Sequence, residues 1–377
     1  MFSLLTTIIT SDKSMKKKIL TLGFSTLLIS PFSSADSDFQ IFSTFDSEVY
    51  TEAQPVKAFI DDFDAPLTSG DSAFTYNVFE LGVGYGNFKI GYQSRFDYVL
   101  SFDPDTANYL HTEKNDLPFE ERDYVYYLDG KQSTTNGLFI SYDFKFLESD
   151  ALTITPKLTV FASTHFQDAN VEGTVYSDEI QGALEVDYYF SKDVLFKRFT
   201  PDENPSGVGY SFDLAADWKV NQDLTLGFLA QDLFYETEYE DSGFVTGYST
   251  EVPFTETSDG GIATEPTIRL ATSELGHEKT HTFEMPVRLK AYVDYRINSQ
   301  FSSEIMIKRY DQDTFSQVKG RFHFWDHWAL IGGYETNSKS FLLGVENEYF
   351  GLNVQTDNLN IDKAYYANLN WYMKLAF

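Results

Sequence analysis

The sequence predicts an all-β fold, a closed up-and-down antiparallel β-barrel whose strands cross a membrane. Segments of about ten to fourteen residues alternate between apolar and polar side chains, as strands with two different faces do. The chain is 17% aromatic, with 25 Tyr and 35 Phe, which suits the aromatic girdles of such a barrel. Its last segment, 364–377, has one apolar face and ends on Phe377. A soluble β-sandwich would explain the alternation alone, but not this combination.

The N-terminus predicts an export signal ahead of the barrel. Three lysines at 16–18 precede an apolar run at 19–29, and the small residues that a signal peptidase reads end at Ala35. We therefore expect a signal peptide at 1–35, with Met15 as an alternative start that would place 1–14 upstream of the true start. The apolar run is too short for a membrane helix, which needs roughly 20 residues.

The remaining residues, 36–377, are expected to form one barrel domain. Mean hydropathy is −0.30, and no later stretch of roughly 18 residues is continuously apolar, so a helical membrane protein is excluded. The chain has no cysteine, which excludes disulfides, thiolate metal sites and a lipoprotein anchor.

The charge is strongly acidic. The full chain carries 57 acidic and 28 basic residues; residues 1–35 hold four Lys and one Asp, so the mature chain would carry 56 and 24, a net charge of −32. Nucleic acid is therefore excluded as a partner, because its phosphates would be repelled.

The period-2 pattern predicts sixteen strands if short turns and long loops must alternate. The alternative is fourteen, with 38–50 tucked into the lumen and one C-terminal hairpin only partial. The expected strands are 38–50, 74–86, 87–101, 135–147, 151–164, 178–190, 194–199, 207–220, 223–236, 283–298, 300–311, 314–325, 328–337, 340–349, 351–358 and 364–377. The expected long extracellular loops lie near 51–73, 102–134, 165–177 and 237–282, with a shorter one at 200–206.

The C-terminal segment carries a more specific signal. Its apolar face consists of Leu369, Trp371, Met373, Leu375 and Phe377. It resembles the closing strand of Gram-negative outer-membrane β-barrels, whose assembly machinery reads a terminal aromatic preceded by alternating hydrophobic residues. The resemblance implies a location in the outer membrane of a Gram-negative bacterium, with membrane lipid, lipopolysaccharide and the barrel assembly machinery as partners.

From residue 207 onward the strands resemble those of porin-like and fatty-acid-transporter-like transport barrels. The segments that carry this resemblance are 207–220, 223–236 and the closing hairpins 329–334 and 341–350. After Asp36 there is no signature of a fatty-acid-binding hatch, so the resemblance implies an architecture and not a cargo.

The facing of the strands predicts two charged walls in the lumen. The basic wall consists of Arg288, Lys290, Arg296, Lys308, Lys319 and Arg321, and the acidic wall of Glu185, Asp187, Asp213 and Asp217. Opposed walls of this kind set ion preference in a pore. The alternative is that the charges pair with one another and fill the lumen.

No catalytic motif is found, and we expect no enzymatic role, no cofactor and no dedicated metal site. The six histidines have no Ser or Asp partner fixed by spacing. The acidic loops lack the regular spacing of a calcium loop, so a solvated surface is favoured over cation binding.

The function predicted from these observations is a channel or porin for passive or weakly selective passage of small solutes. The alternatives are a non-conducting barrel that assists export of a surface polymer or appendage, and a transporter of hydrophobic substrates.

Overall fold

A computed structural model describes residues 39–176, 181–195, 205–249, 255–256, 262–263, 270–325 and 327–377. The predicted signal peptide at 1–35 lies outside the described residues, as does most of the predicted strand 194–199.

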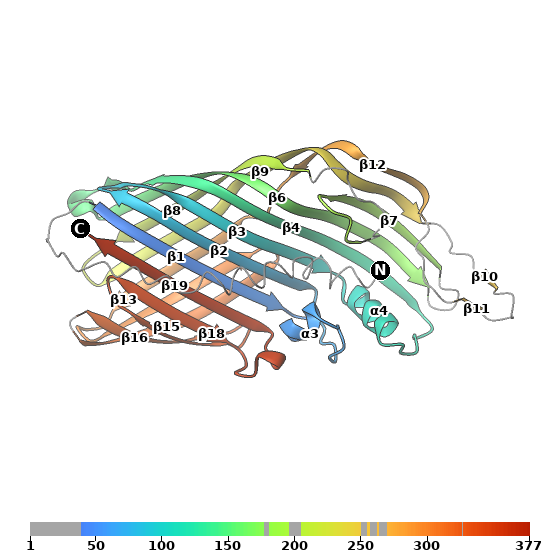
Figure 1. The fold of residues 1–377 in the computed structure, drawn as a ribbon. Coiled ribbons are helices and arrows are strands. Elements are labelled where there is room, and N and C mark those ends of the chain that lie inside the picture. The colour runs from blue at the N-terminus through green and yellow to red at the C-terminus, as the bar shows by residue number, and fades with distance from the viewer. Residues whose placement is uncertain are drawn as a thin grey trace.

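The wall is a closed antiparallel barrel of fourteen strands (Figure 1). Closure joins the two ends of the chain: the first strand pairs with the last from Gln40 opposite Ala376 to Tyr50 opposite Tyr366. In order around the wall the strands are β1 (Phe39–Thr51), β2 (Ser72–Tyr85), β3 (Phe88–Phe102), β4 (Asp123–Tyr142), β6 (Leu152–Tyr176), β8 (Gly207–Lys219), β9 (Leu224–Ser249), β13 (Arg288–Arg296), β14 (Phe301–Tyr310), β15 (Asp313–Trp325), β16 (Trp328–Glu335), β17 (Phe341–Glu346), β18 (Phe350–Thr356) and β19 (Tyr366–Ala376).

The count is the smaller of the two considered, but for a different reason. The segment near 38–50 is not tucked into the lumen: β1 pairs with both β19 and β2. Both C-terminal hairpins are also complete parts of the wall. The expected strand 178–190 is instead β7 (Gln181–Phe190), which pairs with the outer parts of β6 and β9, while β8 pairs with their inner parts. Because β7 and β8 share one position in the wall, the wall has fewer strands than the sequence has predicted strand segments.

The strands on one side of the barrel, called the tall side, extend further toward the outer end, to the right in Figure 1, than the strands on the other side. β4, β6 and β9 run on past the hairpins of the opposite wall, and β12 (Leu270–Phe283) pairs with the outer part of β9 above β13 (Figure 1). Much of the predicted loops 102–134, 165–177 and 237–282 is therefore strand. The remaining elements are α3 (Val56–Ile60), α4 (Pro104–Lys114), β5 (Phe144–Phe146), β10 (Thr255–Glu256), β11 (Ile262–Ala263) and the 3-10 turns η1 (Glu148–Asp150) and η2 (Ile361–Lys363).

Helix α4 protects the free edge of β4, which extends beyond the end of β3. The Asp103 carboxylate caps the helix by accepting from the Asp105 amide at 2.8 Å. Inside the helix, the Thr106 hydroxyl accepts from the Tyr127 amide at 2.8 Å and donates to its carbonyl at 3.0 Å. Arg122 donates two hydrogen bonds to Asp105, at 2.8 and 2.9 Å, and these lower the pKa of that carboxyl. An edge that would otherwise be open to another strand is thus covered.

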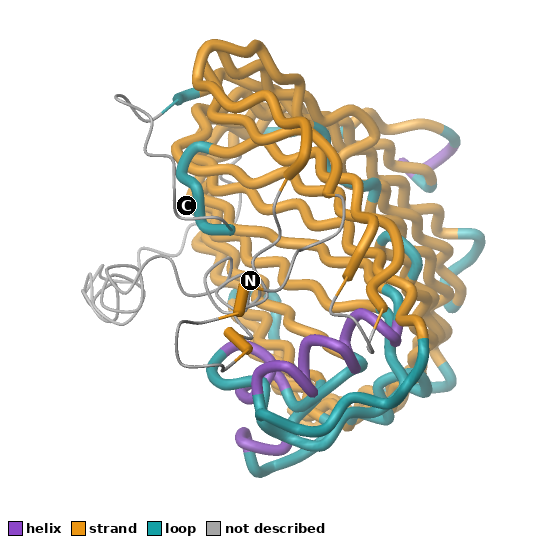
Figure 2. Tube along the Cα trace, turned by 90° about the vertical axis from the view of Figure 1, so that its right-hand side faces the viewer, coloured by secondary structure: helices purple, strands orange, loops and turns teal. Residues whose placement is uncertain are grey.

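At the outer end, the outward face of the sheet is covered rather than exposed. Ile90 and Leu138 lie nearer the inner end of β3 and β4 and are 41% and 63% exposed. Leu100 and Leu128 continue the same faces and are only 3% and 1% exposed. They belong to an apolar cluster that includes residues of α3, α4 and the segment 191–195. Figure 2, seen from the end where these helices lie, shows them gathered on one side of the mouth.

Below this cluster, the outside is apolar and the inside is polar. On β14, Ile305 and Ile307 are 57% and 53% exposed, whereas Glu304 and Lys308, which flank them in sequence, are 5% and 8% exposed. The same alternation along β13 to β19 gives a continuous apolar outer band, which is the pattern of a barrel that crosses a membrane. None of the described helices has the length and apolar character needed to cross a membrane.

The facing of β19 makes a prediction. Leu369 is exposed on the outer face, so Leu369→Lys should place a charge against lipid at a cost of roughly 2 to 4 kcal/mol near the midplane. We expect a clear loss of folded, membrane-inserted protein, measured by heat-modifiable migration after extraction from outer membranes. Asn370→Lys is the matched control, because Asn370 lines the water-accessible interior. Equal insertion of the two variants would show that the facing is wrong.

Candidate functional site: the interior of the barrel

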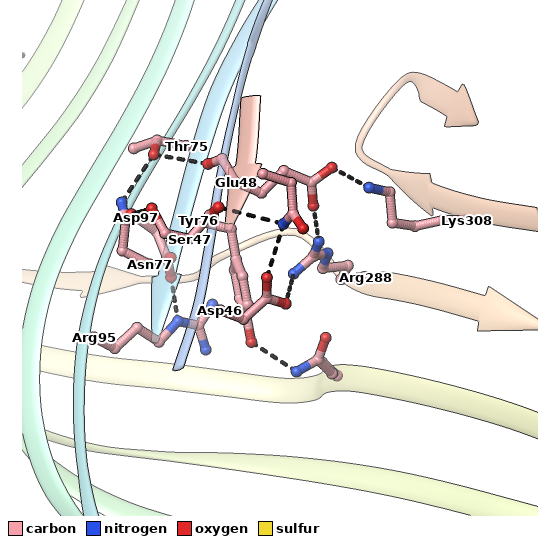
Figure 3. A network of polar contacts seen from close by, with 12 residues as sticks. Asp46, Ser47, Glu48, Thr75, Tyr76, Asn77, Arg95, Asp97, Arg288 and Lys308 are labelled. Carbon is pink, nitrogen blue, oxygen red and sulfur yellow. Dashed lines mark hydrogen bonds and ion pairs between the residues drawn. The ribbon is translucent and has the colours of Figure 1, made fainter. Parts of the chain in front are cut away.

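Opposite walls of the barrel touch through a buried ion cluster. The Glu48 carboxylate of β1 accepts hydrogen bonds from Arg288 of β13 and Lys308 of β14, both as ion pairs (Figure 3). The Tyr366 hydroxyl donates to the same carboxylate at 2.7 Å. Since β1 and β13 lie seven positions apart in a wall of fourteen strands, this contact spans the whole lumen.

A second ion cluster joins β3 to β9. Arg95 donates two hydrogen bonds to the Asp232 carboxylate, at 2.7 and 2.6 Å, and a third to Asp97. Asp232 sits at an irregularity of β9 with a φ of 57°, and its amide donates to Asp213 at 2.9 Å. Asp213 in turn lies 3.3 Å from the Lys157 ammonium of β6. The left-handed backbone at Asp232 is what turns a carboxylate of β9 toward Arg95.

Tyr76 of β2 connects the two clusters. Its ring lies 3.9 Å from the Arg288 guanidinium carbon and 5.1 Å from that of Arg95, and its hydroxyl accepts from Gln231 at 2.6 Å. Glu48 and Asp97 are each 1% exposed. Water therefore has little access at this level, and the lumen is closed by side chains from the wall itself.

An aromatic layer lies directly above the ion clusters, on the side of the helices. Tyr50, Phe74 and Tyr310 each stand two residues beyond Glu48, Tyr76 and Lys308 toward the outer end of their strands. The rings pack edge to face, with centroids 5.1 Å apart for Tyr50 and Phe315 and for Phe74 and Tyr310. The full buried cluster contains Tyr50, Phe74, Val99, Phe161, Phe166, Tyr235, Tyr239, Phe283, Met285, Tyr310, Phe315 and Tyr366.

The turn between β14 and β15 reaches across to the other wall at the same height. Ser101 of β3 donates to Asp311 at 2.8 Å, and Ser72 of β2 donates to Asp313 at 3.1 Å. The Gln312 amide donates to the Asp71 carbonyl at 3.0 Å. These contacts close the mouth of the barrel on its short side.

The inner end holds a polar cavity of about 420 Å³. Arg321 donates to three carboxylates around it: Asp294, Glu304 at 2.7 Å and Glu346 at 3.0 Å. Lys319 also binds Glu304, at 2.9 Å. The cavity is lined by Thr225, Lys290, Tyr292, Asp294, Glu304, Lys319, Arg321, Ile331, Glu346, Asn353, Asn370 and Tyr372.

Above the aromatic layer the inner face of the tall side is polar, and we call this face the outer vestibule. Asp168 of β6 lies 3.0 Å from the Lys131 ammonium and 2.9 Å from His281 of β12. The His281 ring stacks on Tyr189 with centroids 4.0 Å apart. Within the described residues, no group of three or more acidic or histidine side chains is arranged to hold a metal ion.

The residues of the two predicted walls are placed unequally. Five of the basic set, Arg288, Lys290, Lys308, Lys319 and Arg321, line the ion clusters or the cavity, whereas Arg296 is exposed at the end of β13. Of the acidic set, Asp213 joins the second ion cluster, and Asp217 accepts a hydrogen bond from Tyr292. Glu185 and Asp187 lie opposite Glu172 and Asn170, exposed in the outer vestibule and far along the sheet from the basic residues.

The predicted separation into open walls of opposite charge is therefore not what the structure shows. Five of the ten, Arg288, Lys308, Lys319, Arg321 and Asp213, form ion pairs, because an unpaired charge in a closed interior costs several kcal/mol.

Four residues of the ion clusters were not predicted from the sequence as lining the lumen: Glu48, Arg95, Asp97 and Asp232. The first three lie on the polar faces of period-2 segments, so their inward direction could have been predicted. Glu48 shares its face with Asp46, and Arg95 and Asp97 share theirs with Gln93. Asp232 could not, since a strand irregularity sets its direction and the irregularity leaves no period in the sequence.

The closed wall, apolar outer band and charged interior define a transmembrane β-barrel of the outer-membrane type. The closed barrel with its apolar outer band places the protein in the outer membrane.

Three solved structures give the scale of the similarity to known barrels. The toluene transporter TodX of P. putida is 9% identical over 91% of both chains, with a TM-score of 0.42. The toluene transporter TbuX of Ralstonia pickettii is 10% identical over 90% of this chain and 89% of that chain, with a TM-score of 0.43. The translocator domain of the autotransporter NalP from Neisseria meningitidis is 7% identical over 98% of both chains, with a TM-score of 0.33. No protein-family model and no curated protein matches the sequence. Values of this size assign no substrate.

The first ion cluster makes a prediction about stability. Glu48→Gln removes the charge shared by Arg288 and Lys308, and leaves Lys308 buried with a neutral partner and Arg288 with only the carboxylate of Asp46, 3.9 Å away. We expect the free energy of unfolding to fall by about 3 to 5 kcal/mol. The measurement is urea-induced unfolding of the barrel in lipid vesicles, followed by tryptophan fluorescence.

The control is Glu185→Gln, which neutralises an exposed carboxylate of the outer vestibule and should change the same free energy by less than about 0.5 kcal/mol. If Glu48→Gln were as stable as the control, the cluster would not hold the two walls together.

Proposed function

We propose that this protein is a gated channel for small polar solutes, and that the described structure is its closed state. The observation that carries the proposal is the position of the closure. The polar face of the outer vestibule and the inner cavity are separated by the ion clusters and the aromatic layer above them.

The nature of the closure supports a gate. In the part of the chain that the structure describes, the lumen is closed by wall side chains and by the short turn between β14 and β15. Side chains change rotamer, and short turns move, on times far shorter than the unfolding of a barrel. A charged solute can compete with one partner of an ion pair for the other, because both side chains remain charged when the pair separates.

A second candidate is passage of small aromatic or apolar solutes. The aromatic layer favours it, because twelve buried residues, ten of them aromatic, surround the path just above the ion clusters. An apolar ring could replace ring contacts there without leaving a polar group unpaired. A polar solute, in contrast, would need the layer to open.

Conductance distinguishes a gate from a permanent pore. We expect the native protein in planar bilayers to be closed for most of the time. A triple variant, Glu48→Ala with Arg288→Ala and Lys308→Ala, removes the first ion cluster as a complete set and should raise the open probability several-fold. The matched control removes three exposed charges of the outer vestibule, Glu172, Glu185 and Asp187, by Ala substitution and should leave it unchanged.

Each result separates the candidates. Large, stable open steps in the native protein would mean a permanently open porin and would overturn the proposal. A correctly folded triple variant that stays silent would also overturn it and would favour the barrel that assists export. Silence to ions combined with faster uptake of toluene into vesicles would favour passage of apolar solutes.

A further inference from the structure

The inner cavity contains a cation without an opposite partner. Lys290 lines the cavity, and its side chain has neither a hydrogen bond nor an ion pair with another described residue. Its ammonium lies 5.7 Å from the centroid of the Tyr292 ring. An ammonium offers three donors, so Lys290 presents unused hydrogen-bonding capacity to the space in front of it.

Away from Lys290, the carboxylates of the cavity outnumber their cation partners by one. Asp294, Glu304 and Glu346 surround only two cations, Arg321 and Lys319. The excess negative charge is spread over this cluster, whereas the unpaired positive charge is at Lys290. Along β13, Lys290 and Asp294 are four residues apart, which corresponds to about 13 Å between their Cα atoms.

A third group also lacks a partner. The Asn353 side-chain oxygen is buried and accepts no hydrogen bond from any other described residue. It belongs to the cavity lining on the wall away from β13. The cavity thus offers a free donor at one place and free acceptor capacity at another, and its volume falls within the range of about 300 to 1,000 Å³ typical of ligand pockets.

From this arrangement we infer that the inner cavity is a binding site for small zwitterions, such as amino acids with separated amino and carboxylate groups. The carboxylate of the solute binds Lys290, and its ammonium lies against the cluster of Asp294, Glu304 and Glu346. A simple anion would satisfy Lys290 but would face the excess carboxylate charge, and a simple cation would face Lys290. This inference rests on the proposed function, for which it names the class of solute.

Binding of three matched probes to the full protein in detergent tests it by isothermal titration calorimetry. 6-Aminohexanoate carries both charges, hexanoate only the carboxylate, and hexylammonium only the amine. We expect 6-aminohexanoate to bind at least about tenfold more tightly than either of the others, the ratio that one hydrogen bond to a charged group provides. Equal binding of hexanoate would identify a plain anion site and overturn the inference, as would absence of binding by all three.

Variants locate the site. Lys290→Gln should weaken 6-aminohexanoate about tenfold or more, and Glu346→Gln should weaken it while improving hexanoate. Arg296→Gln is the matched control, because Arg296 lies on the same strand but does not line the cavity, and it should change binding less than twofold. Unchanged binding in Lys290→Gln would overturn the assignment. Should that variant not fold, the probe comparison on the native protein still decides.

The calorimetric result is independent of the gate. Binding is measured at equilibrium and without current, so a barrel that never opens can still bind 6-aminohexanoate. Loss of the gating effect with intact binding would refute the proposed function alone, and intact gating without binding would refute this inference alone.

Discussion

The contact of Glu48 with Arg288 and Lys308 sets the form of the interior. A carboxylate and two cations can be buried together only if each finds its partner, because the cost of removing an isolated charge from water exceeds what packing returns. Meeting this condition brings β1 against β13 and β14 across the lumen. Tyr76 then fills the space between Arg288 and Arg95, and the second ion cluster follows on its other side.

Above and below this level the barrel has different chemistry. Aromatic rings occupy the space toward the helices, where Tyr50, Phe74 and Tyr310 pack on one another. Toward the other end, the three carboxylates around Arg321 line a cavity of about 420 Å³ with charge. A solute crossing the barrel would meet a polar vestibule, an apolar layer, an ion cluster and a charged cavity in turn. Two polar regions are thus separated by an apolar layer and an ion cluster, without a separate plug in the described residues.

The tall side of the wall shows why period alone gave too many strands. Leu184 and Val186 of β7 alternate with charged residues as a membrane strand would. Their apolar face is covered by residues of α3, α4 and 191–195 instead of lipid. A strand that packs on a protein core and a strand that faces lipid both have one apolar and one polar side. The sequence pattern therefore cannot distinguish the two environments.

The sequence by itself determined the all-β barrel, its apolar outer band, and the inward direction of residues such as Arg288, Lys308 and Arg321. These features depend on the alternation of apolar and polar residues within each strand. Because side chains repeat every second residue, this alternation fixes which of them face the lumen. Only the tertiary structure decided that β7 and β8 share one position in the wall, that Asp232 turns toward Arg95, and that Glu48 meets cations from the opposite side. Those outcomes depend on a strand irregularity and on contacts between residues 240 and 260 positions apart, neither of which leaves a period in the chain.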